Sequence, residues 1–141
     1  MTSRRLSRPE SQNWFPRAVG VIGGVSFLAF GIWAMVGPVS FFETVAAFEP
    51  YNQHFLQDIG AFQIGLGAVL LLAAASDRAD ALAVGLMGVG VGSAAHTVSH
   101  LVGQDFGGTP EVDIPVFAVL SLLLLVAGVV RWREHRARPA R

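Results

Sequence analysis

The sequence contains no cysteine and has few charged residues. Without cysteine, the chain can form no disulfide, no thiolate zinc site and no thiol redox centre. Charged residues make up 14% of the 141 residues, well below the roughly 25% that is usual in a soluble domain. Hydrophobic residues make up 52%, and the mean hydropathy is +0.53. This composition excludes a disordered chain and indicates one membrane domain spanning residues 1–141.

Several functional classes are disfavoured by what is missing. The ten basic residues are balanced by ten acidic ones, so no basic field predicts a nucleic-acid partner. The sequence contains no phosphate-binding glycine loop, no H-E-x-x-H zinc motif and no G-x-S-x-G nucleophile elbow. These absences favour a protein that is not an enzyme, and they leave no residue assigned to catalysis.

Four apolar segments dominate the chain, and each is long enough to cross a bilayer. A spanning helix needs about 20 apolar residues, within a range of roughly 17–25. Polar turns and helix-ending residues separate the segments. Asp113 is expected to cap the last helix, with Pro115 in its first turn. The sequence predicts an all-α bundle of four transmembrane helices at about residues 16–37, 54–76, 79–102 and 113–132.

The first loop carries a helical pattern of its own. Ser40 and Glu43 have the S-x-x-E spacing of a capping box. Phe41, Val45 and Phe48 then recur on one helical face. We therefore expect a short interfacial helix at about residues 40–49, ended by Pro50. The alternative is an irregular loop with scattered phenylalanines.

Arginine supplies every basic residue, and its positions divide the chain into two sides. Arginines precede the first helix, occupy the turn at 76–78 and follow the fourth helix. The segments 38–53 and 103–112 contain no arginine and carry acidic residues instead. Because short cytoplasmic segments are enriched in arginine and lysine, we expect a multi-pass protein of the plasma (inner) membrane with both termini in the cytoplasm.

Glycines recur at helix-packing spacings within the apolar segments. Gly20 and Gly24 form one G-x-x-x-G pair, and Gly88 and Gly92 form another. In lipid, such small residues let helix backbones approach closely. We interpret the pairs first as contacts within the bundle. A homo-oligomer, or a membrane-protein partner packed on the same motifs, is the alternative.

Four ionisable residues lie within the expected spans. His54 and Asp58 are four residues apart in the second helix, and His96 and His100 are four residues apart in the third. Consecutive helices joined by a tight turn should be antiparallel neighbours, so the two pairs are expected at similar depth near the outer face. Gly85, Gly88 and Gly92 share the face of His96, which predicts that the histidines point into the bundle.

Three interpretations of this His/Asp cluster remain open. Asp58 can accept hydrogen bonds from a histidine across the helix pair and fix the packing. The set His54, Asp58, His96 and His100 can instead bind zinc, copper or iron(II). A histidine can also serve as a haem ligand or a quinone partner. We favour a non-enzymatic membrane component whose pocket is structural or binds a partner or lipid; the alternative is a metal- or haem-binding protein.

Two stretches carry a resemblance to known sequences. The segments Asn52–Gly67 and Ala95–His100 resemble a group of small, uncharacterised four-helix membrane proteins of actinobacteria. The resemblance implies a four-helix fold and a plasma-membrane location, and it implies no activity. This chain departs from many such sequences at Gln57, where a basic residue is common.

The topology gives the first testable prediction. A reporter active only in the cytoplasm, fused after Arg141, should be active, because the arginine-rich ends stay inside. The same reporter inserted into segment 103–112 should be inactive. The reverse pattern would contradict the assigned orientation.

Overall fold

The computed structural model describes residues 13–137 and contains five α-helices and one short 3₁₀ turn. No strand occurs within that range, so the expected all-α class is confirmed. Four of the helices are long and apolar enough to cross a membrane, which fits a multi-pass membrane protein. The elements are α1 (Trp14–Val36), α2 (Pro38–Thr44), α3 (Gln53–Ala75), α4 (Ala79–Val102), the turn Gln104–Phe106 and α5 (Pro110–Arg136).

The last helix begins earlier than the sequence suggested. Pro110 occupies its first turn, and Thr109 rather than Asp113 is the N-cap residue. Asp113 lies in the first turn, and its carboxylate accepts hydrogen bonds from the backbone N–H (2.9 Å) and the hydroxyl (3.1 Å) of Thr109, the N-cap residue. Pro115 consequently lies inside the helix and not in its first turn.

The short helix α2 differs from the expected interfacial helix at 40–49. It ends at Thr44, so Val45 and Phe48 lie outside it. The capping box does not form, because Pro38 starts the helix directly after Gly37. The Ser40 hydroxyl is used elsewhere: it accepts a hydrogen bond from Trp33 Nε1 and donates one to the Gly37 carbonyl, both at 2.9 Å.

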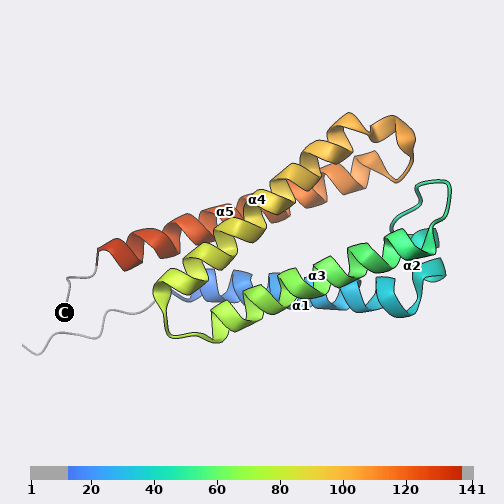
Figure 1. Cartoon of the computed structure of the whole chain (residues 1–141). Coiled ribbons are helices and arrows are strands. Elements are labelled where there is room, and N and C mark those ends of the chain that lie inside the picture. The colour runs from blue at the N-terminus through green and yellow to red at the C-terminus, as the bar shows by residue number, and fades with distance from the viewer. Residues whose placement is uncertain (1–12, 138–141) are drawn as a thin grey trace, which may run out of the picture.

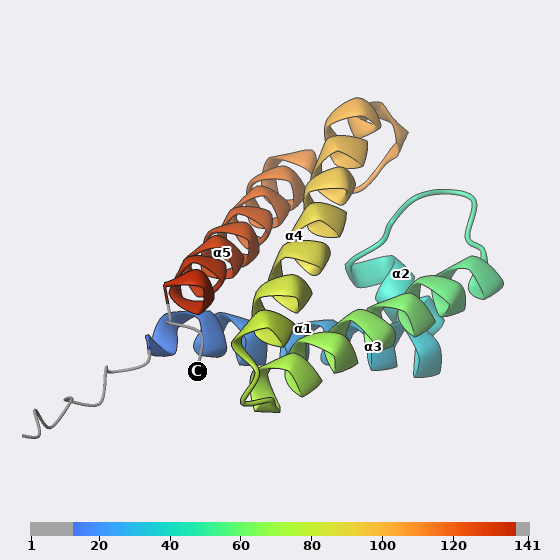
Figure 2. The same cartoon turned by 60° about the vertical axis from the view of Figure 1, so that its left-hand side comes forward.

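The four long helices form two antiparallel hairpins, α1 with α3 and α4 with α5 (Figures 1 and 2). We call the end that holds the start of α1, the 76–78 turn and the end of α5 the termini end. The opposite end is the loop end. From the 76–78 turn, α3 and α4 diverge toward the loop end (Figure 2). The expectation that these two helices lie side by side is therefore correct only near their turn.

Glycines hold α1 against α3 with backbone in contact with backbone. A Cβ atom at Gly31 would lie 2.8 Å from the Gly60 carbonyl oxygen, and one at Gly60 would lie 2.7 Å from the Gly31 carbonyl oxygen. Seven residues, or two helical turns, farther along α3, a Cβ at Gly67 would lie 2.7 Å from the Gly24 carbonyl oxygen. No larger residue fits at these levels, so glycine sets the distance between the two helices.

The second hairpin combines a glycine contact with a polar one. A Cβ at Gly128 of α5 would lie 2.5 Å from the Met87 side chain of α4. Nearer the loop end, the Thr97 hydroxyl lies 3.2 Å from the Ser121 hydroxyl, and both side chains are buried. A hydrogen bond between spanning helices is worth about 0.6–2 kcal/mol, so this pair supports the packing of α4 on α5.

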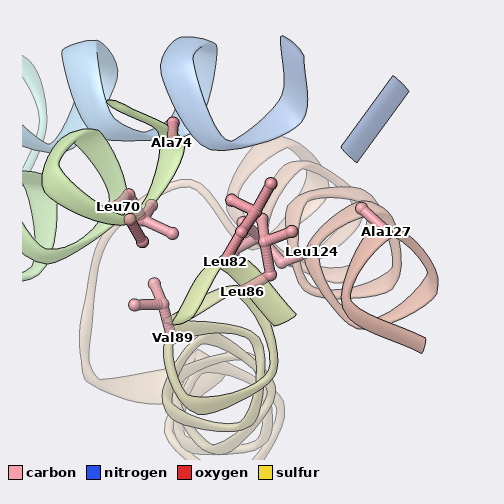
Figure 3. Packing of buried hydrophobic residues seen from close by; sticks show 8 residues of the cluster. Leu70, Ala74, Leu82, Leu86, Val89, Leu124 and Ala127 are labelled. Carbon is pink, nitrogen blue, oxygen red and sulfur yellow. The ribbon is translucent and has the colours of Figure 1, made fainter. Parts of the chain in front are cut away.

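The hydrophobic core lies toward the termini end, where all four long helices meet. Leu70 of α3, Leu82 and Leu86 of α4 and Leu124 of α5 point toward one another there (Figure 3). A second, smaller cluster at the loop end has Ala34 of α1, Phe41 of α2 and Leu56 of α3 as its buried members, and Val45 and Ala46 of the loop after α2 pack against it. The loop end of α4 and α5 is thus outside both clusters.

Two arginines contribute to packing at the termini end. Arg17 of α1 donates a hydrogen bond to the Ser76 carbonyl (3.1 Å) and thereby caps the end of α3. Arg131 lies within α5, is buried and pairs with Glu134 at 3.1 Å. The positive charge at this end therefore includes structural residues.

The glycine contacts give a stability prediction with a matched control. Gly67→Val should lower the thermal unfolding temperature of the detergent-solubilised protein, because overpacking costs about 1–3 kcal/mol. Gly65→Val, two residues away on the same helix, should change it little, since a Cβ there meets nothing within 4 Å. Equal effects of the two substitutions would contradict the assigned α1–α3 contact.

Candidate functional site

The two histidines of α4 form an aromatic cluster with α5. His96 and His100 lie one turn apart, with ring centroids 4.7 Å from each other. The ring of Phe117 on α5 lies 4.6 Å from His96 and 4.8 Å from His100. The His96 residue is exposed, whereas the side chain of His100 is 13% exposed. His96 is therefore the histidine that a molecule beside α4 can reach.

Asp113 supplies the carboxylate of this cluster. Its Oδ2 atom lies 3.9 Å from His100 Nδ1, and its side chain is 16% exposed. The two hydrogen bonds from Thr109 hold the carboxylate in place. The arrangement places a carboxylate acceptor beside the His100 ring at the loop end.

The loop after α2 closes over this cluster. The Gly108 N–H donates a hydrogen bond to the Ala47 carbonyl (3.2 Å), and the Phe48 ring lies 5.8 Å from the His100 ring. Gly107 and Gly108 have φ values of 132° and 78°, which residues with a side chain rarely adopt. A Cβ at Gly107 would also lie 2.7 Å from the Ala47 carbonyl oxygen, so the contact requires glycine.

The other predicted pair lies on α3 and is separate. His54 Nε2 is 3.5 Å from Asp58 Oδ2, as the spacing of four residues predicts. Both side chains are exposed, and Asp58 is 55% exposed. The pair therefore lies on the surface of its own hairpin.

The expected four-ligand site of His54, Asp58, His96 and His100 is not formed. Among residues 13–137, no group of three or more His, Cys, Asp or Glu side chains is placed to hold a metal ion. The physical reason is the pairing of the helices: the glycines of α3 fix it against α1, and α3 then leaves α4 beyond the turn. The structure instead brings His96 and His100 together with Asp113.

Sequence reasoning assigned Asp113 to a cap and overlooked Phe117. A signal was available, because Asp113, Phe117 and Ser121 recur every four residues along α5. In an antiparallel hairpin, residues at equal distances from the connecting loop lie opposite each other. Counting from the loop 103–109 therefore places this row of α5 opposite the row of α4 that contains Thr97 and His100. The prediction failed because α3, and not α5, was taken as the partner of α4.

The side of α4 that carries His96 is largely uncovered. Near the turn, this face contacts α3, since a Cβ at Gly85 would lie 3.1 Å from the Ala73 Cβ. Farther out, a Cβ at Gly88 or Gly92 would meet nothing within 4 Å. The expectation of a tightly packed glycine face is thus wrong beyond Gly85. The exposed residues that continue this face are Gly88, Gly92, His96 and Ser99.

The opposing side of α3 is uncovered in the same way. It contacts Gly85 through Ala73 and Val69 near the turn. Toward the loop end it continues through Leu66, Phe62 and Phe55, which are exposed, Phe62 by 76%. Asp58 borders this row. We call the two surfaces the unpaired faces: Gly88, Gly92, His96 and Ser99 on α4, and Phe55, Phe62 and Leu66 on α3.

The carboxylate contacts at the loop end give a local prediction. Asp113→Ala should destabilise the start of α5 by about 1–2 kcal/mol, because the Thr109 donors lose their acceptor. Amide hydrogen exchange in residues 103–112 should accelerate as a result. Glu111→Ala, at an exposed position two residues earlier, should leave exchange unchanged; acceleration in both variants would count against the assigned contacts.

Compared with known proteins, the chain matches no family model, no curated protein and no solved structure. The chemistry of the loop end therefore follows from its own side chains. Imidazoles, carboxylates and a hydroxyl there can accept or donate hydrogen bonds and bind a charged group. The unpaired face of α3 is apolar, with Phe55, Phe62 and Leu66 exposed.

Proposed function

We propose that this protein is a non-enzymatic component of the plasma membrane that binds a phospholipid between α3 and α4. The unpaired faces carry the proposal. Two apolar helices share a turn, diverge, and leave the surfaces that look toward each other uncovered. A molecule in that position must be largely apolar, because the four spans are themselves apolar.

The distribution of charge supports a particular orientation. The arginines within residues 13–137 lie at the termini end, at positions 17, 78, 131, 133 and 136. By the positive-inside rule, that end faces the cytoplasm. The loop end then faces outward, and the bound phospholipid belongs to the outer leaflet. The resemblance to small actinobacterial membrane proteins supports the same location.

The shape of the unpaired faces favours a lipid chain over general lipid contact. A chain lying against one helix touches protein on one side only. Beside the turn, where Gly85 of α4 contacts Ala73 and Val69 of α3, a chain lying against both helices would touch protein on two sides, so more of its surface would gain van der Waals contact. Gly88 and Gly92 leave room on the α4 side, and Phe62 and Leu66 supply apolar contact on the α3 side.

The polar groups lie where a headgroup would be. His96 and Ser99 end the α4 face at the loop end, and Asp58 borders the α3 face near its start. Apolar surface below and polar side chains above match the two parts of an amphiphile. This arrangement requires no metal and no reaction.

Filling the space on α4 tests the proposal. Gly92→Leu should reduce the phospholipid retained per purified protein severalfold, because the new side chain occupies the position of the lipid chain. Val91→Leu, at an exposed position about 100° around α4 from Gly92, should retain the wild-type amount. Native mass spectrometry of protein extracted in mild detergent measures both.

Three outcomes would overturn the proposal. The first is that the wild-type protein retains no phospholipid, and the second is that the Gly92→Leu variant retains as much as wild type. The third is that wild type forms a dimer and the same substitution abolishes it. Stoichiometric metal or a haem absorption band in the purified protein would support a metal- or haem-binding function instead.

A further inference from the structure

We propose that the two hairpins separate and rejoin at the loop end, and that residues 45–51 form a docking loop that holds them together. The motion changes the distance between the unpaired faces. It goes beyond the proposed function and does not depend on a bound lipid. Three observations carry it: the anchoring of the loop, the contacts of its tip, and the kind of packing between the hairpins at the termini end.

Both ends of the docking loop are attached to the α1–α3 hairpin and its short helix α2. At the start of the loop, Val45 and Ala46 pack against the buried cluster around Phe41. At its end, the Tyr51 ring lies 5.2 Å from the Phe42 ring of α2. The loop therefore belongs to this hairpin, and its tip extends to the other one.

The tip, Ala47 and Phe48, docks on the α4–α5 hairpin. The Ala47 carbonyl accepts a hydrogen bond from the Gly108 N–H at 3.2 Å, and the Phe48 ring lies edge-on to the His100 ring at 5.8 Å. Ala47 is exposed and Phe48 is half-buried, so water can replace the hydrogen bond when the tip leaves. Segments with few buried apolar contacts and solvent-exposed backbone hydrogen bonds are those that open at low free energy.

The packing within each hairpin differs from the packing between them. Within each hairpin, glycines meet backbone atoms of the partner helix. Between the hairpins, a Cβ at Gly20 of α1 would lie 3.2 Å from Leu82 Cδ1 of α4, and one at Gly23 would lie 3.6 Å from Leu124 Cδ2 of α5. Leucine side chains can change rotamer as helices shift. The angle between the hairpins can thus change while each hairpin keeps its form.

Residues 76–78 provide the bend. They lie between α3, which ends at Ala75, and α4, which begins at Ala79, and Asp77 and Arg78 are exposed. Hinge motions are absorbed by a few residues at the ends of such elements. With this turn as the pivot, a small change of angle gives its largest displacement at the loop end, where the docking loop lies.

Spin labels on the full-length protein measure the separation of the hairpins. Because the sequence contains no cysteine, Gln53→Cys on α3 and Val102→Cys on α4, both at exposed positions, provide the only labelling sites. In nanodiscs, pulsed electron paramagnetic resonance should show a major short distance and a minor longer one. Phe48→Ala should raise the share of the longer distance severalfold, because the ring that docks on His100 is lost.

Matched variants isolate the docking contact. Phe106→Ala removes a phenylalanine that is 77% exposed in the neighbouring loop, so it should leave the distances unchanged. Gly107→Ala should act like Phe48→Ala, since its Cβ would lie 2.7 Å from the Ala47 carbonyl oxygen. Labels at positions 102 and 129, on α4 and α5 of one hairpin, should report one distance in every variant.

Three results would overturn the inference. A wild-type protein without the longer distance would identify the docking loop as a permanent clamp. An equal response to Phe48→Ala and Phe106→Ala would remove the role of the tip. A change between positions 102 and 129 that accompanies the change between the hairpins would show that the hairpins do not move as units. The retention of phospholipid, which Gly92→Leu tests, is a separate measurement, so either proposal can fail without the other.

Discussion

The backbone contact between α1 and α3 is the constraint on which the rest of this structure depends. In a bilayer no hydrophobic effect pulls helices together, so the closest contacts decide which helices pair. Gly24, Gly31, Gly60 and Gly67 let α1 and α3 meet carbonyl against Cα. Because α3 packs along the whole of α1, it does not also pack along the length of α4. The divergence of the hairpins and the uncovered surfaces between them are consequences of that choice.

Much of the fold follows from composition and from the placement of polar breaks. The number of spans, their approximate bounds and the all-α class could be predicted because a bilayer fixes the length of a spanning helix. The pairing of the helices could not. Glycine spacing marks a surface as able to pack, but it does not name the partner: Gly60 and Gly88 look alike in sequence, yet one touches backbone and the other faces open space.

At the candidate site too, the sequence marks the ionisable residues but does not say which of them meet. His96 and His100 were identified because ionisable residues in apolar segments stand out, and their mutual contact follows from helical spacing. Their carboxylate partner was misassigned, since sequence reasoning took α3, and not α5, as the partner of α4. Which ionisable residues lie in the apolar spans could thus be predicted from the sequence, whereas which of them meet depended on one packing choice far from the site.

The hydrogen bond between Gly108 and Ala47 has a consequence for access. It joins the two hairpins at the loop end, as the 76–78 turn joins them at the other. The chain is thereby a closed frame, with α3 and α4 as its two long sides. A molecule bound between those sides, as proposed, would enter and leave sideways, within the plane of the bilayer, without crossing the aqueous surface. Exchange would then depend on lateral diffusion in one leaflet rather than on solubility in water.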